Sequence, residues 1–453
     1  MEDQCVITRQ VTVAGGVFAP GHLGELTQIV PFEMAGHALA ATGTTQARIR
    51  VLPSRVVVCL LLAGCLFTEL GYRQVWHKLT AGLGTLRVAR PGDNALWQAR
   101  ARLGAAPLRW LFDLLRGPAT AITAGSVRWH GLLVCAIDGT TMTIPDSSRN
   151  LAVYGRQACN NGGSGYPLLR LVALVACGTR TVIDAVIGPA SRGELDYARR
   201  LVRSLRPGML VLADRHFGAA ALIGQLAATE AHLLVRLKAN RKLPVLRPYR
   251  DGSWLSQIGA VPVRVAGCEI TIATSAGRRT GAYRLATTLR SWRRYPAPEL
   301  IRLYHQRWEI ETAYLELKSS LLGGRVLRAR TPAGVAQEVY ALLTCYQVLR
   351  IAITDAIEAA GGIDPGRGSF TVALNAARDL LTQAANVIAG TVIDLTGDIG
   401  RRVLGNLLPD RRLRVSPRIV KRAISKYQAR GPDINRRSYK ATLSINILTA
   451  SGP

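Results

Sequence analysis

The hydrophobic and polar positions of residues 299–322 follow the repeat of a helix, and no Pro or Gly interrupts this stretch of the sequence. Because Pro298 lies just ahead, and Pro is favoured in the first turn of a helix, we expect the helix to begin near Ala297. At about 100° per residue, four polar residues share one stripe roughly 60° wide. These residues are Tyr304, Arg307, Glu311 and Lys318.

Apolar residues border this stripe on both sides, and a second polar face lies elsewhere on the helix. One apolar row is Ile301, Trp308 and Leu315, and the other is Leu303, Ile310 and Leu317. The face expected to meet solvent consists of Arg302, His305, Glu309, Glu316 and Ser320. A carboxylate held between apolar rows needs a partner or a metal. Two interpretations stay open for Arg307 and Glu311, which are four residues apart: an internal ion pair or a functional site.

The pattern changes along the rest of the chain, which predicts several regions. Residues 23–115 are mostly helical in pattern and rich in Arg, as in a DNA-binding module or in a scaffold with a basic surface. Strands come first in residues 126–237 and then alternate with helices, which predicts an α/β fold with a mixed sheet and helices on its faces. Residues 240–290 predict a small β-rich insertion, and residues 351–453 a helical, basic C-terminal region.

The individual elements expected from these patterns are as follows. The expected helices are 56–70, 72–81, 94–103, 107–115, 193–205, 219–228, 337–356, 371–381 and 385–389. The expected strands are 132–137, 141–144, 168–177, 181–187, 209–213, 232–237, 261–265, 269–274 and 283–288.

Two acids, Asp138 and Asp214, directly follow apolar runs that predict strands. Loops at strand ends are where α/β sheets place functional groups, although a single such Asp is more often a turn or capping residue. Together with Glu311 they would make three carboxylates, which repel each other unless one or two Mg²⁺ ions bind between them. Such a two-metal site holds the attacking and leaving oxygens of a phosphoryl transfer.

Charge and cysteine usage narrow the class of protein further. The 453 residues carry a formal net charge of +29, which favours a polyanionic partner and nucleic acid in particular. Arg-rich composition from a genome-wide bias is the alternative explanation of this charge. The eight Cys are scattered and predict buried thiols of a reducing compartment. We expect a cytoplasmic protein, because the longest apolar run, residues 56–67, is too short to span a bilayer and the N-terminus lacks the layout of a signal peptide.

Three blocks of the sequence resemble the signature blocks of DDE transposases of the insertion element 4 family. They are Asp138-Gly139-Thr140, Ala213-Asp214-Arg215-His216-Phe217, and the series Tyr304, Arg307, Glu311 and Lys318, which matches the Tyr-Arg-Glu-Lys pattern of that family at every position and spacing. The N-terminal region, including residues 52–55 and 99–104, is also similar to that family. The resemblance covers roughly residues 20–350.

This resemblance implies an RNase H-like catalytic core in which Asp138, Asp214 and Glu311 bind two divalent ions, Mg²⁺ or in its place Mn²⁺. It implies cleavage at the ends of a mobile element, in related enzymes through a hairpin, followed by strand transfer into target DNA. Tyr304, Arg307 and Lys318 would contact DNA phosphates. Beside the second acid, Arg215 is a candidate for contact with a phosphate or a carboxylate. The partners implied are double-stranded DNA, with terminal inverted repeats and a target, and a second copy of the chain. The domains expected are a helical DNA-binding domain (1–125), a catalytic domain (126–350) and a C-terminal region (351–453).

Other residues keep a structural interpretation beside a functional one. Trp254 and Trp292 are candidates for stacking on a flipped base, but either is equally typical of a core. Asp146 is expected in a turn, Glu194 in the first turn of a helix, and His216 in a structural role. Two other functions remain as alternatives: a metal-dependent nuclease that does not join DNA, and a domesticated DNA-binding protein. The three intact acids argue against the last.

Overall fold

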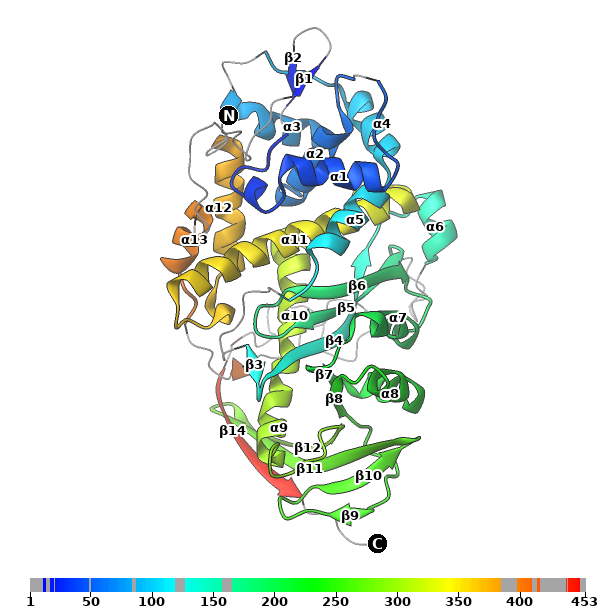
Figure 1. The fold of residues 1–453 in the computed structure, drawn as a ribbon, viewed down its shortest axis with the longest axis vertical. Coiled ribbons are helices and arrows are strands. Elements are labelled where there is room, and N and C mark those ends of the chain that lie inside the picture. The colour runs from blue at the N-terminus through cyan, green and yellow to red at the C-terminus, as the bar shows by residue number, and fades with distance from the viewer. Residues whose placement is uncertain are drawn as a thin grey trace.

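A large mixed sheet forms the centre of the protein, and helices cover both of its faces (Figure 1). The computed structural model describes residues 11–13, 17–19, 21–48, 50–83, 87–118, 127–156, 165–383, 397–409, 414–415, 437 and 439–448. The central strands run in the order β6-β5-β4-β7-β8. They are β4 (Leu132–Thr143), β5 (Leu168–Ala176), β6 (Val182–Pro189), β7 (Met209–Ala213) and β8 (His232–Arg236). Strands β4, β5 and β6 pair antiparallel, whereas β7 and β8 continue the sheet parallel to β4.

The two faces of this sheet belong to two different cores, because successive side chains of a strand point to opposite sides. On β4, Leu133, Cys135 and Ile137 pack with α7 (Glu194–Leu201) and α8 (Ala220–Ala227). Val134, Ala136 and Met142 face the other core, which contains α10 (Trp308–Leu315) and α11 (Pro332–Ala360). The even-numbered side chains of β4 therefore point towards α10.

A second set of strands extends the sheet beyond β8, as the prediction of a β-rich insertion requires. It contains β9 (Arg247–Pro248), β10 (Trp254–Ile258), β11 (Val261–Thr274) and β12 (Gly277–Thr287). The expectation of two strands at 261–265 and 269–274 is wrong, because β11 runs through both and pairs with β12 along its length. The C-terminal region is not purely helical either: β14 (Tyr439–Leu448) pairs antiparallel with β11 and is drawn in red in Figure 1.

The N-terminal helices pack against helices from the C-terminal half of the chain. Helix α11 crosses the molecule between the N-terminal helices and the sheet (Figure 1). The other helices of this region are α1 (Phe32–Ala41), α2 (Ser54–Leu66), α3 (Tyr72–Thr80), α4 (Asp93–Leu103), α5 (Ala106–Leu115), α12 (Phe370–Gln383) and α13 (Gly397–Leu404). One hydrophobic core joins them to one face of the sheet. The expected helix at 385–389 and most of the basic stretch at 401–440 lie outside the described residues. Within the described residues, no helix has the length and apolar character needed to cross a membrane.

The helix expected from Ala297 onward is present, but it is not one regular α-helix. It consists of α9 (Ala297–Tyr304), a 3₁₀ turn (His305–Arg307), α10 and a π-helical turn (Glu316–Leu321). Both kinds of turn change the rotation per residue away from 100°. The predicted faces are therefore wrong in part. Glu309 and Glu316, expected in solvent, are buried, whereas Trp308 and Leu315, expected in apolar rows, are exposed.

The sequence predicted that Asp138 follows the end of a strand, and this prediction is wrong. Strand β4 continues through Asp138 to Thr143 because residues 138–143 pair with β5. Its pairing with β7, however, stops at Ile137. Asp138 therefore lies where the sheet opens on one side only, and its neighbour across the gap is the residue after Ala213, which is Asp214.

Candidate active site

The three acids of the predicted site come from three elements that meet on the α10 face of the sheet. Asp138 and Asp214 follow the even-numbered, inward positions of β4 and β7, whose neighbours Ala136 and Leu212 belong to the same core as α10. Glu311 comes from α10, one turn after Arg307.

Tyr314 fixes α10 on the sheet beside the first acid. Its hydroxyl lies 2.7 Å from the carbonyl oxygen of Asp138 and accepts a hydrogen bond of 3.1 Å from the backbone N–H of Ala173 on β5. One turn later, the Nζ atom of Lys318 donates to the Oγ1 atom of Thr140 at 3.0 Å. Asp138 and Thr140 are two residues apart and point to the same side of β4. The Tyr-Arg-Glu-Lys series therefore runs along this part of the strand.

Arg307 is the buried cation of the site. Its Nη1 atom lies 3.3 Å from the Oδ2 atom of Asp138, and its Nη2 atom lies 3.4 Å from the Oε1 atom of Glu311. Burial lowers the pKa of Arg307, but the charges of Tyr304, Asp138, Asp214 and Glu311 oppose this effect, and the pKa is raised overall. The ion pair between Arg307 and Glu311, which was one of the two interpretations of this helix, is thus present. It forms part of the acid cluster of the proposed site.

Asp138 holds its proton more strongly than an ordinary aspartic acid. Its pKa is raised to about 6, chiefly by burial and also by the charges of Glu311 and Glu194, although a hydrogen bond from the N–H of Gly139 and the charge of Arg307 lower it. A carboxyl group in this setting gains from a bound cation, because a cation compensates both the burial and the neighbouring acids.

Asp214 lines a cavity of about 450 Å³ beside the site. The hydroxyl of Tyr304 donates to the carbonyl oxygen of Ala213 at 3.1 Å, which places Tyr304 next to the second acid. Apolar side chains of β11, β12 and β14 also line the cavity, together with Arg307 and Trp308. Arg215 follows Asp214 directly and is exposed.

The donor set suits a hard divalent cation, although the described residues contain no group of three His, Cys, Asp or Glu side chains close enough to hold a metal ion together. Carboxylate oxygens are the ligands that Mg²⁺ and Mn²⁺ prefer. In this structure Arg307 bridges two of the three carboxylates at distances longer than usual for a charged hydrogen bond. The acids of the site therefore already hold one cationic group between them. Their charge and their oxygen atoms are also suited to a divalent metal ion.

Sequence reasoning missed Glu194 and Tyr314 as residues near the site. Glu194 is the first residue of α7, as expected, and it pairs with Arg170, but its carboxyl group also reaches Gly139. A Cβ atom at Gly139 would lie 2.8 Å from the carboxyl carbon of Glu194, so Gly at this position allows the approach. The Gly of the Asp-Gly-Thr block was the only sequence signal for this contact.

The structure separates the two Trp candidates. Trp254 is buried beneath β11, so its interpretation as a core residue is confirmed and it has no face for stacking. Trp292 is half-buried, and its stacking role stays a prediction. His216 lies 3.9 Å from Glu194 and is exposed. Asp146 is exposed in the segment between β4 and α6 (Ser148–Tyr154) and lies near Arg156.

Comparison with known proteins points in one direction. The family model described as "Insertion element 4 transposase N-terminal" matches residues 20–113, and the model described as "Transposase DDE domain" matches residues 129–348. The transposase InsG for insertion sequence element IS4 of Escherichia coli K12 is 27% identical over 407 residues, which cover 87% of this chain and 91% of that protein. The putative transposase InsZ of the same organism is 30% identical over 194 residues, covering 42% of this chain and 62% of that protein.

Among solved structures, the piggyBac transposase synaptic complex with hairpin DNA matches 61% of this chain and 58% of that chain, with a TM-score of 0.37 and 14% identity. The two family matches follow one another along the chain and include every residue of the three signature blocks. The chain belongs to the insertion element 4 family of DDE transposases, the enzymes that cut and join DNA at the ends of mobile elements.

Proposed function

We propose that Asp138, Asp214 and Glu311 form the catalytic triad of this transposase and bind two Mg²⁺ ions, which Mn²⁺ can replace. The observation that carries the proposal is the position of Arg307, whose guanidinium pairs with Asp138 and Glu311 and is influenced by the charge of Asp214. Divalent ions bound there would neutralise charge on the attacking and leaving oxygens of a phosphodiester.

We infer that the sheet and its helices form an RNase H-like core. Three antiparallel strands followed by two parallel ones, in the order β6-β5-β4-β7-β8, support this assignment. The first acid is on the central strand β4, the second follows the adjacent strand β7, and the third is on α10, which packs on β4 and β5 while the 3₁₀ turn before it contacts β7.

The remaining residues of the signature would hold the DNA backbone. Arg307 keeps a buried Nε atom for which the described residues offer no hydrogen-bond acceptor, so a phosphate beside Asp138 would find a donor there. Lys318 would add a point charge on the Thr140 side of the site, and Tyr304 and Arg215 would contact phosphates near Asp214. These cations would orient the scissile phosphate while the acids stay deprotonated.

We further infer the partners of the enzyme from this site and from the net charge of +29. The DNA partners are the terminal inverted repeats of the element and a target duplex, and the N-terminal region would help to grip the repeats. Two copies of the chain would act together, one for each end of the element. Because bacterial DNA lies in the cytoplasm, on the nucleoid, we expect the protein to work there.

The proposal is tested with a DNA duplex that carries the terminal repeats flanking the gene, Mg²⁺ and a supercoiled target plasmid. The wild-type protein should release the ends and join them to the plasmid. Asp138→Asn, Asp214→Asn and Glu311→Gln should each abolish cleavage and joining while the protein still binds the duplex in a gel-shift assay. Asp146→Asn, a change of an exposed acid outside the site, is the matched control and should leave both steps unchanged. Full cleavage by Asp214→Asn would show the assignment to be wrong.

A further inference from the structure

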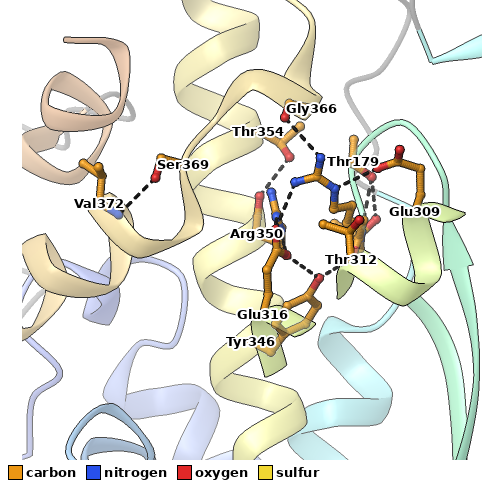
Figure 2. A network of polar contacts seen from close by, with 12 residues as sticks. Thr179, Glu309, Thr312, Glu316, Tyr346, Arg350, Thr354, Gly366, Ser369 and Val372 are labelled. Carbon is orange, nitrogen blue, oxygen red and sulfur yellow. Dashed lines mark hydrogen bonds and ion pairs between the residues drawn. The ribbon is translucent and has the colours of Figure 1, made fainter. Parts of the chain in front are cut away.

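A second cluster of charges includes carboxylates of α10 and of the π-helical turn that follows it (Figure 2). It is buried and joins four separate parts of the chain. Its members are Arg180, Glu309, Glu316, Tyr346 and Arg350.

Arg180 is the centre of this cluster and comes from the turn between β5 and β6. Its backbone has a φ of 59°, which non-glycine residues rarely adopt, and its N–H donates to the carbonyl oxygen of Ala176 at 2.8 Å. The Nε atom donates to Glu309 at 2.8 Å, and the Nη1 atom donates to Glu316 at 3.0 Å. The remaining nitrogen, Nη2, donates to the carbonyl oxygen of Gly366 at 3.2 Å. One guanidinium thus holds two carboxylates that are seven residues apart on the helix.

Glu316 receives a second set of contacts from α11. The Nε atom of Arg350 donates to its Oε2 atom at 3.1 Å, and the hydroxyl of Tyr346 lies 3.1 Å from the same oxygen. The Tyr346 hydroxyl also lies 3.0 Å from the carbonyl oxygen of Arg180. Tyr346 and Arg350 are one helical turn apart, and both pack on the ring of Phe370. These contacts connect the β5–β6 turn, α10, α11 and α12.

The two carboxylates of the cluster lie on either side of Glu311 in the sequence, and the second also lies close to Lys318. Glu309 is two residues before Glu311, and Glu316 is two residues before Lys318. Glu316 is also the first residue of the π-helical turn that carries Lys318. π-Helical turns are rare in proteins as a whole, but those that occur are frequently at functional sites. They change the direction of the side chains that follow them. The cluster therefore contacts α10 near its first turn and the π-helical turn at its first residue.

We propose that Arg180, Glu309, Glu316, Tyr346 and Arg350 act as positioning residues for transposition. Held at two points, α10 keeps Glu311 beside Asp138 and keeps Lys318 beside Thr140. This inference rests on the proposed function, because it concerns how Glu311 and Lys318 are held in place.

The chemistry of the cluster favours positioning over a contribution to stability alone. Two Arg and two Glu balance each other in charge, and all four are buried. Buried ion clusters recover little more than the cost of removing their charges from water, so apolar side chains of equal volume would stabilise the fold as well. Ion pairs differ from apolar contacts in fixing a direction and a register.

The experiment compares Glu316→Gln and Arg180→Met with a matched control, Asp184→Asn. Asp184 is fully buried on β6 and pairs with Arg116 and Arg203, and the structure gives it no contact with α9, α10 or the π-helical turn. The measurements are the melting temperature, the Kd for the terminal-repeat duplex, the cleavage rate at saturating DNA and the Kd for Mn²⁺ without DNA. All are made at a temperature at which every variant is folded.

The expected result is a cleavage rate lower by about 10- to 100-fold for Glu316→Gln and Arg180→Met, with a nearly unchanged Kd for DNA. Binding of Mn²⁺ should weaken several-fold in both variants, because Glu311 no longer lies beside Asp138. Asp184→Asn should lower the melting temperature and leave the cleavage rate and the Kd for Mn²⁺ unchanged. Arg180→Lys should recover part of the rate, since it restores one ion pair.

A wild-type rate and wild-type Mn²⁺ binding in Glu316→Gln and Arg180→Met would overturn the inference, as would losses that Asp184→Asn shares. If Glu316→Gln does not fold, Tyr346→Phe is measured in its place, because it removes only one hydroxyl group. It should lower the cleavage rate and weaken Mn²⁺ binding in the same way, by smaller factors. Glu311→Gln is included in the same assay. Full cleavage by that variant would refute the proposed function itself, whereas an inactive Glu311→Gln beside fully active cluster variants would refute only the positioning role.

Discussion

The Nη1 atom of Arg307 lies 3.3 Å from the Oδ2 atom of Asp138, so the proposed first metal ligand is already paired with a buried cation. The same guanidinium reaches Glu311 at 3.4 Å. One positive group therefore balances two acids that would otherwise repel each other. When metal and DNA are bound, this guanidinium can pair with a phosphate only if a divalent ion balances the charge of the two acids in its place.

Arg307→Ala is expected to change metal binding and cleavage in opposite directions. Removing a positive charge from between the acids should tighten binding of Mn²⁺ to the DNA-free protein several-fold, as measured by isothermal titration calorimetry. Cleavage should fall by about 10²–10³-fold, because a donor aimed at the phosphate is lost. If Arg307 served only as one member of a structural ion pair, the variant would instead lose stability and keep its cleavage rate once folded.

Gly139→Ala is expected to disturb the site through Glu194. The new Cβ atom would lie 2.8 Å from the carboxyl carbon of Glu194, which Arg170 holds in place, so the carboxyl group must move away. We expect a cleavage rate lower by about tenfold and a loss of stability of about 1–3 kcal/mol, measured by urea denaturation.

A double-mutant cycle checks this explanation of the Gly139 variant. If Glu194 is the obstacle, Gly139→Ala should have little effect in a protein that already carries Glu194→Ala, and the two changes will not be additive. Additive losses would mean that the Ala side chain disturbs β4 directly.

The sequence indicated much of the site because its signals are local. The period of the helix placed Arg307, Glu311 and Lys318 on one stripe. In the structure Arg307 and Lys318 contact β4, and Glu311 pairs with Arg307. Strands β7 and β8 were predicted almost to the residue, because short apolar runs bounded by polar residues are typical of buried strands.

The features that the sequence did not predict depend on contacts with residues far away in the chain. The local pattern placed Glu309 on the solvent face of the helix. In the structure it is buried and pairs with Arg180, which lies 129 residues earlier in the chain. The Asp-Gly pair at 138–139 is typical of a turn, but pairing with β5 keeps it extended. Neither contact leaves a period or a spacing in the sequence, so local patterns favoured the wrong face and the wrong boundary.

His22 should make the stability of the N-terminal region depend on pH. Its Nε2 atom lies 2.9 Å from the carbonyl oxygen of Leu79, and its Nδ1 atom accepts from the N–H of Gly24 at 3.2 Å, so the neutral ring is the form that fits. Burial lowers the pKa of His22, against a smaller opposite effect of the bond to Leu79. Its contribution is therefore complete above the unfolded pKa of about 6.5 and is lost as the pH falls below it, by up to about 1.4 kcal/mol per unit.

The measurement for His22 is urea denaturation of the wild type and of His22→Gln at pH 7.5 and at pH 5.5. The difference in unfolding free energy between the two proteins should shrink at the lower pH, because only the wild type loses the contribution of a neutral His22. An equal difference at both pH values would contradict the assignment. Other His residues titrate in both proteins and cancel in the comparison.

Thr140→Val should weaken catalysis without weakening the fold. The substitution keeps the shape of the side chain on β4 but removes the oxygen that accepts from Lys318 at 3.0 Å. We expect cleavage at saturating DNA to fall by about 3- to 10-fold, because one hydrogen bond of roughly 1–1.5 kcal/mol no longer orients the ammonium group. Thr140→Ser keeps the hydroxyl and is the matched control, with a rate close to the wild type. The Kd for DNA decides between the two possible roles of Lys318: a change in rate alone means that Thr140 aims the lysine at the reacting phosphate, whereas an equal change in Kd would mean that the lysine only holds the duplex.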